Sequence, residues 1–152
     1  MKRINKLIVL LLFLTGVFSA SYAEPQVVIP NESQVASSIS AIQVKPSEVV
    51  RNPEMFLNKT IKMNAKFDKF STIGLDYPPA LRKSDDYISF MVYRDDTSFD
   101  IPQSEMKLFL KRDEAQKFVD LKSKDKVLVT GKVFSTALGD PWVDVLTLET
   151  IK

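Results

Sequence analysis

The sequence predicts a mainly β domain, a five-stranded Greek-key barrel with one short helix between its third and fourth strands. The first observation is the run 126–134, Lys-Val-Leu-Val-Thr-Gly-Lys-Val-Phe, whose alternate residues are valine or glycine. A period of two is typical of a strand with one buried face. The second is the order of the patterns along the chain, which is three strands, a helix and two strands. Curling five strands into a barrel reduces the edges that a flat sheet would expose.

Composition limits the chemistry that this chain can perform. Its 152 residues suit one domain, and 45% hydrophobic with 26% charged residues is ordinary for a globular protein. The chain has no cysteine and no histidine. Disulfides, zinc thiolate sites, cysteine nucleophiles and Ser-His-Asp triads are therefore excluded within this chain. We expect no metal, no cofactor and no enzymatic activity.

Residues 1–23 have the pattern of a secretory signal peptide. Lys2, Arg3 and Lys6 precede the apolar run 7–18, and Ser21-Tyr22-Ala23 offers a cleavage site. The alternative is a retained membrane anchor, but the run is shorter than the roughly 20 residues of a spanning helix. Removal would leave 18 of the 21 basic residues against 19 acidic ones, so a general basic field for nucleic acid is absent. We expect a periplasmic or secreted protein.

Residues 24–44 are predicted to be a flexible linker, because they contain Pro25 and Pro30 and a middle rich in Ser, Gln and Asn. The barrel domain is then 45–152. Ser47 and Asn52-Pro53 can each start one short helical turn before the first strand.

Five segments are predicted to be strands, and a helix is the competing prediction for the third because that segment also suits helical propensity. They are residues 60–70, 87–94, 104–111, 126–134 and 142–151. The loop 71–86 is long enough to suggest a role in binding. In the fourth strand, Gly131 is expected where a strongly coiled strand must bend.

The helix is predicted from Asp113. Asp113 and Gln116 match a capping box, which would make Asp113 the N-cap. Ala115, Phe118 and Val119 then share one apolar face, which we expect to plug one end of the barrel.

Three strands, a helix and two strands are the layout of the OB-fold, a partly open five-stranded Greek-key barrel. The entry Glu-Val-Val-Arg-Asn-Pro-Glu-Met-Phe-Leu-Asn-Lys at 48–59 and the run Leu-x-x-x-Asp-x-Val-x-Val-x-Gly-x-Val at 121–133 support it. In these stretches and in its hydrophobic last strand, the chain resembles small exported OB-fold proteins related to the tRNA-anticodon-binding-like OB family. The resemblance covers most of 45–152 and implies the fold. It assigns a role to no single residue.

OB-folds commonly bind ligands on the face of strands two and three, between the loop joining strands one and two and the loop joining strands four and five. Here these loops are 71–86 and 135–141. Aromatic rings and cations on such a face suit bases and phosphates, and they equally suit a peptide or protein partner. Cations that are simply solvated and rings that cap the barrel are the alternative. The candidate ligand-binding residues are Tyr77, Arg82, Lys83, Tyr87, Tyr93, Arg94, Lys107, Phe109, Lys111, Phe134 and Trp142.

We therefore expect an exported, non-catalytic OB-fold binding module whose ligand is a protein, a peptide or a small molecule of the cell envelope. A single-stranded oligonucleotide binder is the first alternative, because Lys62, Lys66, Lys69 and Lys132 can share one surface. A structural subunit of an envelope complex is another.

A small serine or carboxylate hydrolase is the catalytic alternative. Ser104 and Lys107 match Ser-x-x-Lys, but the companion motifs of that enzyme class are missing. Asp140 and Asp144 could form a carboxylate pair. Asp95, Asp96 and Asp100 could gather around calcium, but a solvated turn is the simpler interpretation.

Overall fold

The computed structural model describes residues 40–78 and 81–152. The predicted signal peptide and the predicted linker up to residue 39 lie outside these residues. No helix within them is long and apolar enough to cross a membrane. The elements, in chain order, are β1 (Ile42–Gln43), α2 (Pro46–Arg51), α3 (Pro53–Phe56), β2 (Thr60–Ser71), β3 (Tyr87–Val92), β4 (Lys107–Lys111), α4 (Arg112–Ala115), η2 (Gln116–Phe118), β5 (Lys126–Ser135), η3 (Ala137–Gly139) and β6 (Trp142–Thr150).

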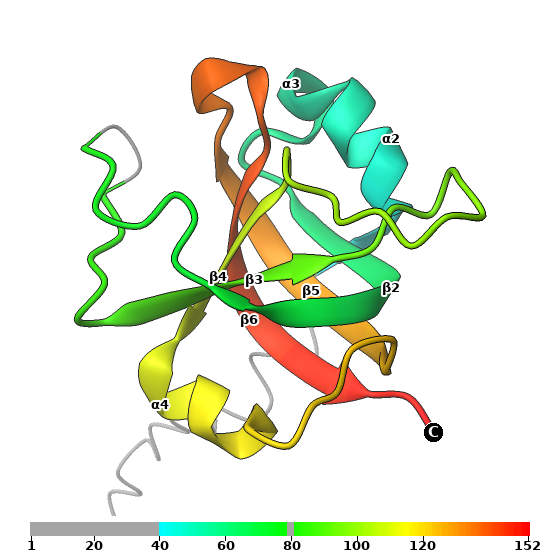
Figure 1. The fold of residues 1–152 in the computed structure, drawn as a ribbon. Helices are drawn as coiled ribbons and strands as arrows, with labels where there is room; N and C mark the ends of the chain where they lie inside the picture. Colours follow the sequence, from blue (N-terminus) through cyan, green and yellow to red (C-terminus); the bar gives the residue numbers. More distant parts are fainter. Residues whose placement is uncertain (1–39, 79–80) are drawn as a thin grey trace, which may run out of the picture.

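Strands β2 to β6 close into the predicted barrel (Figure 1). The sheet order is β1-β2-β3-β4-β6-β5, and β2 also pairs with β5, which completes the ring. β4 and β6 are parallel, whereas the other pairs within the ring are antiparallel. The only helices between β4 and β5 are the short α4 and η2. This is the OB-fold topology, and it settles the third strand as extended, since β4 pairs with both β3 and β6.

One strand was not predicted. β1 pairs in parallel with β2, Ile42 opposite Ile61 and Gln43 opposite Lys62. The next residue, Val44, is buried with the barrel core. The ordered domain therefore includes residues 42–44, which the sequence analysis assigned to the linker. A two-residue strand carries too few residues for its period to be recognised.

The barrel interior is filled by the apolar faces that the alternation predicts. Inward side chains from all five strands form one buried cluster, and β5 and β6 approach closely at Gly131. The β5–β6 register shifts between Thr130 and Gly131, so the expected bend is confirmed as a bulge. A Cβ at Gly131 would lie 2.6 Å from Val143 Cγ1 and 2.7 Å from the carbonyl oxygen of Asp144.

The helix between β4 and β5 lies at one end of the barrel, with α2 and α3 near the other end (Figure 1). Ala115 is buried and Phe118 packs against the core, as predicted. The predicted cap is wrong: the helix begins at Arg112, Lys111 is the N-cap, and no side chain caps it. Val119 is 71% exposed, because four α-helical residues followed by a 3-10 turn are too short to keep a helical face.

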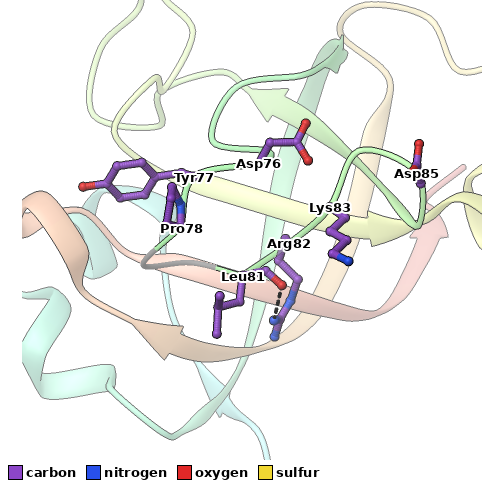
Figure 2. A pocket seen from close by; sticks show the side chains of 7 residues that line it. All are labelled: Asp76, Tyr77, Pro78, Leu81, Arg82, Lys83 and Asp85. Carbon is purple, nitrogen blue, oxygen red and sulfur yellow. Dashed lines mark hydrogen bonds between the residues drawn. The ribbon is translucent and has the colours of Figure 1, made fainter.

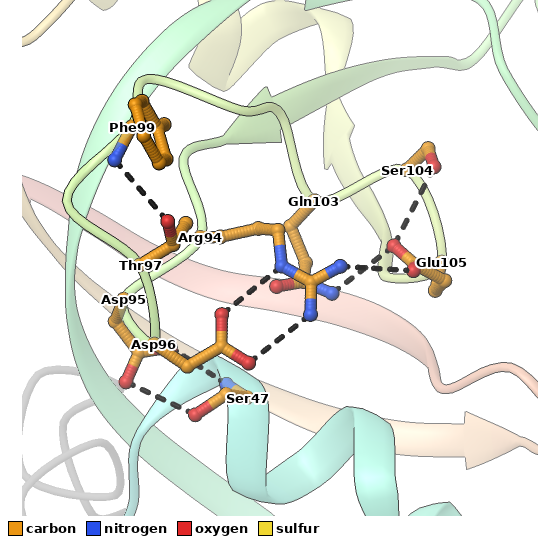
Figure 3. A network of polar contacts seen from close by, with 9 residues as sticks. All are labelled: Ser47, Arg94, Asp95, Asp96, Thr97, Phe99, Gln103, Ser104 and Glu105. Carbon is orange, nitrogen blue, oxygen red and sulfur yellow. Dashed lines mark hydrogen bonds and ion pairs between the residues drawn. The ribbon is translucent and has the colours of Figure 1, made fainter.

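A distant carboxylate fixes α2 to the barrel. Asp95 lies after β3, and its two oxygens accept hydrogen bonds from the Ser47 backbone N–H (2.8 Å) and hydroxyl (3.2 Å) (Figure 3). The helix begins one residue before the predicted Ser47, with Pro46 at its first position. The second turn begins at Pro53, as predicted.

Candidate binding face under the 72–86 loop

The loop between β2 and β3 lies over the outer surface of β4 and β6. Beneath it, Phe109 of β4 and Trp142 of β6 are 0% and 1% exposed, although both lie outside the barrel core. They form a second hydrophobic cluster with Leu75 and Tyr77 of the loop, Tyr87 of β3, Phe134 of β5 and Ala137 of η3. The face on which OB-folds commonly bind ligands is therefore covered by the protein's own loop.

The centre of this cluster is a pile of three rings. Tyr77 from the loop stacks on Trp142 at 5.3 Å between centroids, and Trp142 stacks on Phe109 at 5.8 Å. The indole N–H of Trp142 donates to the carbonyl of Ala137 at 2.7 Å, so its one polar group is satisfied. Gly74 lies close to the pile, because a Cβ there would be 3.0 Å from the indole ring. The loop thus helps to cover the Phe109 and Trp142 rings, while Tyr77 stays partly exposed.

Arg82 fastens the loop to the face. Its Nε donates to Asp144 of β6 at 2.6 Å, and its Nη2 pairs with the other carboxylate oxygen. Its guanidinium carbon lies 4.1 Å from the centroid of the Phe134 ring and 5.4 Å from that of Tyr87. The hydrogen bonds that Arg82 donates to Asp144 raise the pKa of Arg82 above its ordinary value. A bidentate arginine–carboxylate ion pair flanked by aromatic rings is among the more stable arginine contacts in proteins.

The loop has its own internal hydrogen bonds, and Figure 2 shows the side chains that line the cavity within it. The Asp76 N–H donates to the carbonyl of Arg82 at 2.8 Å, and the Asp76 carboxylate accepts the N–H of Ser84 at 2.9 Å. Hydrogen bonds from the side chain and backbone of Ser84 lower the pKa of Asp76. A cavity of about 360 Å³ lies within this loop, lined by Asp76, Tyr77, Pro78, Leu81, Arg82, Lys83 and Asp85.

Six of the eleven predicted ligand-binding residues come together here: Tyr77, Arg82, Tyr87, Phe109, Phe134 and Trp142. Lys83 is exposed on the loop and lines its cavity. Lys107 lies at the edge, where its Nζ bonds Asp140 at 3.0 Å.

The other three predicted residues lie apart from the ring pile. Tyr93 places its hydroxyl 2.9 Å from that of Ser123. Arg94 pairs with Asp96 at 3.0 Å and with Glu105 at 3.5 Å (Figure 3). Lys111 ends β4 as an exposed helix N-cap. These positions do not test whether the residues bind a ligand.

The structure adds residues that the sequence reasoning missed. Asp144 was considered only as a partner of Asp140, yet it binds Arg82, 62 residues away. Ser89, opposite Phe109 in the β3–β4 register, has a buried hydroxyl with no partner in the described part of the chain. Leu81 and Leu138, one in each flanking loop, are 77% and 75% exposed. No local pattern distinguishes these side chains from ordinary loop or strand residues.

The acidic residues considered for calcium have other partners. Asp95 binds Ser47, Asp96 binds Arg94, and Asp100 pairs with Lys124 at 2.7 Å. The hydrogen bond from Lys124 lowers the pKa of Asp100, and the one from Arg94 lowers that of Asp96. Within residues 40–78 and 81–152, no three His, Cys, Asp or Glu residues are grouped as a metal site would require.

Comparisons with known proteins indicate a fold and no family. No protein-family model and no curated protein matches the chain. Among solved structures, a proposed nucleic-acid-binding lipoprotein from Klebsiella pneumoniae is 12% identical, with a TM-score of 0.50 over 82% of this chain and 100% of that one. That similarity agrees with the OB-fold seen in the strand order. The resemblance to the tRNA-anticodon-binding-like family stays a prediction.

Two tRNA synthetases also match at low similarity. A proposed aspartyl-tRNA synthetase from Leishmania major is 13% identical with a TM-score of 0.49 over 74% of this chain. Asparaginyl-tRNA synthetase from Pyrococcus horikoshii is 18% identical with a TM-score of 0.44 over 64% of it. The chain spans only 21% and 20% of the lengths of these two proteins.

Proposed function

We propose that this protein is an exported, non-catalytic OB-fold module that binds a protein or peptide through its two loops, 72–86 and 136–141. The observation that carries the proposal is a pair of exposed leucines, Leu81 and Leu138, at the tips of these loops. They flank the ring pile and present apolar surface where an OB-fold meets its ligands.

Both leucines are held in an unfavourable backbone conformation. Leu81 has φ 53° and Leu138 has φ 63°, in the left-handed region that bulky residues rarely adopt. Each also exposes more than 70% of its surface, so neither gains the burial that normally compensates for strain. Strained residues concentrate at binding sites, and exposed apolar side chains favour a protein partner over solvent.

The ring pile supports a peptide more than an oligonucleotide. Bases stack on accessible rings, whereas Phe109 and Trp142 are fully covered by the loop. The one arginine on the face, Arg82, is bound to a carboxylate, which would also repel phosphate. An oligonucleotide would have to displace the loop before reaching the Phe109 and Trp142 rings. A protein partner can engage the loop tips as they stand.

Oligonucleotide binding remains the second candidate. Proteins bind single-stranded nucleic acids by stacking the bases on aromatic rings and by placing basic side chains near the phosphates, and this protein has an aromatic pile and several lysines on β2. The description of the similar Klebsiella lipoprotein also favours it. Its affinity would fall steeply with salt, since phosphate contacts release counterions.

The absence of catalysis is part of the proposal, and the contacts of Ser104 support it. The Lys107 ammonium bonds the backbone carbonyls of Ser104 and Glu105 and the Asp140 carboxylate. It does not contact the Ser104 hydroxyl, which bonds Glu105 instead. Asp144 is committed to Arg82. From these contacts we infer that neither group activates a nucleophile. Export rests on the sequence pattern of residues 1–23.

Photo-crosslinking in the producing cell's envelope tests the proposal. A photoreactive amino acid replaces Leu138, and the matched control replaces Val119, which is 71% exposed at the helix-capped end. We expect one partner protein to be captured from position 138 and not from 119. Equal capture from both positions, or none from 138, would contradict the loop site.

A salt titration with a labelled single-stranded oligonucleotide separates the two candidates. We expect no binding that is specific to the loops. Tight binding that weakens with salt, and that is lost on replacing Tyr77 and Arg82 with alanine, would favour the oligonucleotide candidate instead.

A further inference from the structure

β5 pairs along one edge of β2, and β1 and β3 pair along the other. On this second edge, two backbone hydrogen bonds leave a gap between them. The carbonyl of Lys62 accepts the N–H of Val44, just after β1, at 3.0 Å. The carbonyl of Lys66 accepts the N–H of Tyr93, just after β3, at 2.8 Å. Because backbone groups of alternate residues point to the same edge of a strand, those of Asn64 point into the space between these bonds.

Asn64 leaves both of its backbone groups open at this edge. In the described part of the chain, neither its N–H nor its C=O has a hydrogen-bond partner, and the residue is exposed. Two clefts of about 460 and 520 Å³ meet at this point, and both are lined by Asn64 and Asp95. An unpaired strand edge beside a cleft is a template for another extended chain.

Two lysines face each other across the same cleft. Lys66 of β2 lies directly opposite Lys126 of β5 in the antiparallel register, and both line the cleft of about 460 Å³. Like charges placed directly opposite destabilise a sheet. Among the described residues neither has an ion-pair partner: the nearby carboxylate of Asp95 is bound to Ser47, and that of Asp100 is paired with Lys124. An anion between the two lysines would remove this repulsion.

We propose that this Asn64 notch binds an extended acidic peptide segment of a partner protein. The segment pairs its backbone with the N–H and C=O of Asn64, and one of its carboxylates lies between Lys66 and Lys126. The opening is one residue of β2 long and is bounded by Val44 and Tyr93. It can therefore accommodate only a short extended segment. This surface shares no residue with the loop site, and the inference does not depend on it.

A peptide matches the notch better than a nucleic acid does. The open carbonyl of Asn64 needs a hydrogen-bond donor, which a peptide backbone supplies and a phosphodiester backbone lacks. The carboxylates of Asp95, Asp96 and Asp100 lie around the clefts or in the adjoining loop and would repel a long polyanion. A single acidic side chain between the two lysines avoids them.

The test uses two capped synthetic octapeptides of alternating Ser and Val, in which one central Ser is replaced by Glu (the Glu-Val peptide) or by Lys (the Lys-Val peptide). Fluorescence anisotropy measures their binding to the whole protein. We expect the Glu-Val peptide to bind and the Lys-Val peptide not to bind. Asn64→Pro removes the open N–H and places a ring carbon there, at an edge position where strands tolerate proline. It should weaken binding at least about tenfold, as expected for a lost backbone bond. Asn64→Ala keeps the backbone and should stay within about twofold.

A second variant keeps the test valid if Asn64→Pro fails to fold. Lys66→Gln with Lys126→Gln should weaken the Glu-Val peptide about tenfold and remove the salt dependence of its binding. Equal binding of both peptides, no binding of either, or unchanged affinity in the lysine variant would overturn the proposal. So would a single-stranded oligonucleotide that displaces the acidic peptide from the notch.

Discussion

Asp76 is a single exposed residue that organises much of the 72–86 loop. Its N–H bonds the carbonyl of Arg82, and its carboxylate accepts the N–H of Ser84. The same carboxylate has a lowered pKa because of Ser84. Its contribution to stability is therefore fully present above the unfolded-state pKa, about 3.9, and is lost as pH falls through the lower folded-state value.

We predict that Asp76→Asn lowers the thermal midpoint at neutral pH, and that the difference from wild type shrinks below about pH 4. Thermal unfolding between pH 7 and pH 2 measures it. Asp85→Asn is the matched control, because Asp85 lines the same cavity but accepts no hydrogen bond in the described chain. A difference between Asp76→Asn and wild type that stays constant across this range would contradict the role assigned to the Asp76 carboxylate.

At the scale of single residues, the sequence predicts which residue types form the candidate site, but it does not predict which residues contact one another. An aromatic and cationic composition indicated Tyr77, Arg82 and Trp142 as candidates, and the structure brings all three together. The pairing of Arg82 with Asp144 could not be predicted from the sequence, because it joins a loop to a strand 62 residues away. Alternation places a side chain on a face and says nothing about which loop will cover that face.

The strand β5 is the element on which barrel closure depends, because it pairs with both β2 and β6. At Gly131 it lies so near β6 that a Cβ would collide with Val143 Cγ1 and with the backbone oxygen of Asp144. The Val143 side chain is buried, and the backbone oxygen cannot turn away. Relief therefore requires the two strands to separate.

We predict that Gly131→Ala destabilises the protein by about 3 kcal/mol, the upper end of the usual cost of overpacking. Gly139→Ala is the comparison, since no atom lies within 4 Å of its added Cβ and only its φ of 76° is unfavourable. It should cost about 1 kcal/mol. Urea unfolding measures both, and an equal or smaller loss for Gly131→Ala would show that β5 and β6 can separate at little cost.

Long periodic elements were predictable, and short or interrupted ones were not. The strands at 60–70, 126–134 and 142–151 carry enough alternating residues for the pattern to be decisive, and each is confirmed within a residue. β1 has two residues and depends on its contact with β2. The N-terminal half of 104–111 lacks pairing, because the strand begins at Lys107, where β6 first meets it. The capping pattern at Asp113 failed because β4 runs directly into the helix.

At the largest scale, residues 40–78 and 81–152 form a closed barrel with a loop layer attached to its outside. The barrel holds one apolar cluster, and the ring pile under the loop is a separate cluster on the other side of the β4–β6 wall. The loop layer is attached by ring stacking and by the Arg82–Asp144 pair, whereas the barrel is closed by backbone ladders. Layers held by different interactions can open at different free energies.

We predict that Arg82→Ala loosens the loop while the barrel stays intact. Loss of two hydrogen bonds between charged groups should lower the free energy of local opening by about 1.5–3 kcal/mol. In hydrogen exchange, the Asp76 and Ser84 amides should therefore exchange about tenfold to a hundredfold faster, while amides of the β2–β5 ladder keep their wild-type rates. Trp142, the only tryptophan of the chain, should show red-shifted fluorescence as the loop no longer shields it.

Lys83→Ala is the control, because Lys83 lines the same loop cavity and has no ion-pair partner among the described residues. It should leave both the exchange rates and the fluorescence unchanged. If Arg82→Ala instead accelerates exchange equally in the loop and in the β2–β5 ladder, the loop and the barrel unfold as one unit. The ring face would then become accessible only on global unfolding, and partners would have to bind the loop tips of the closed protein.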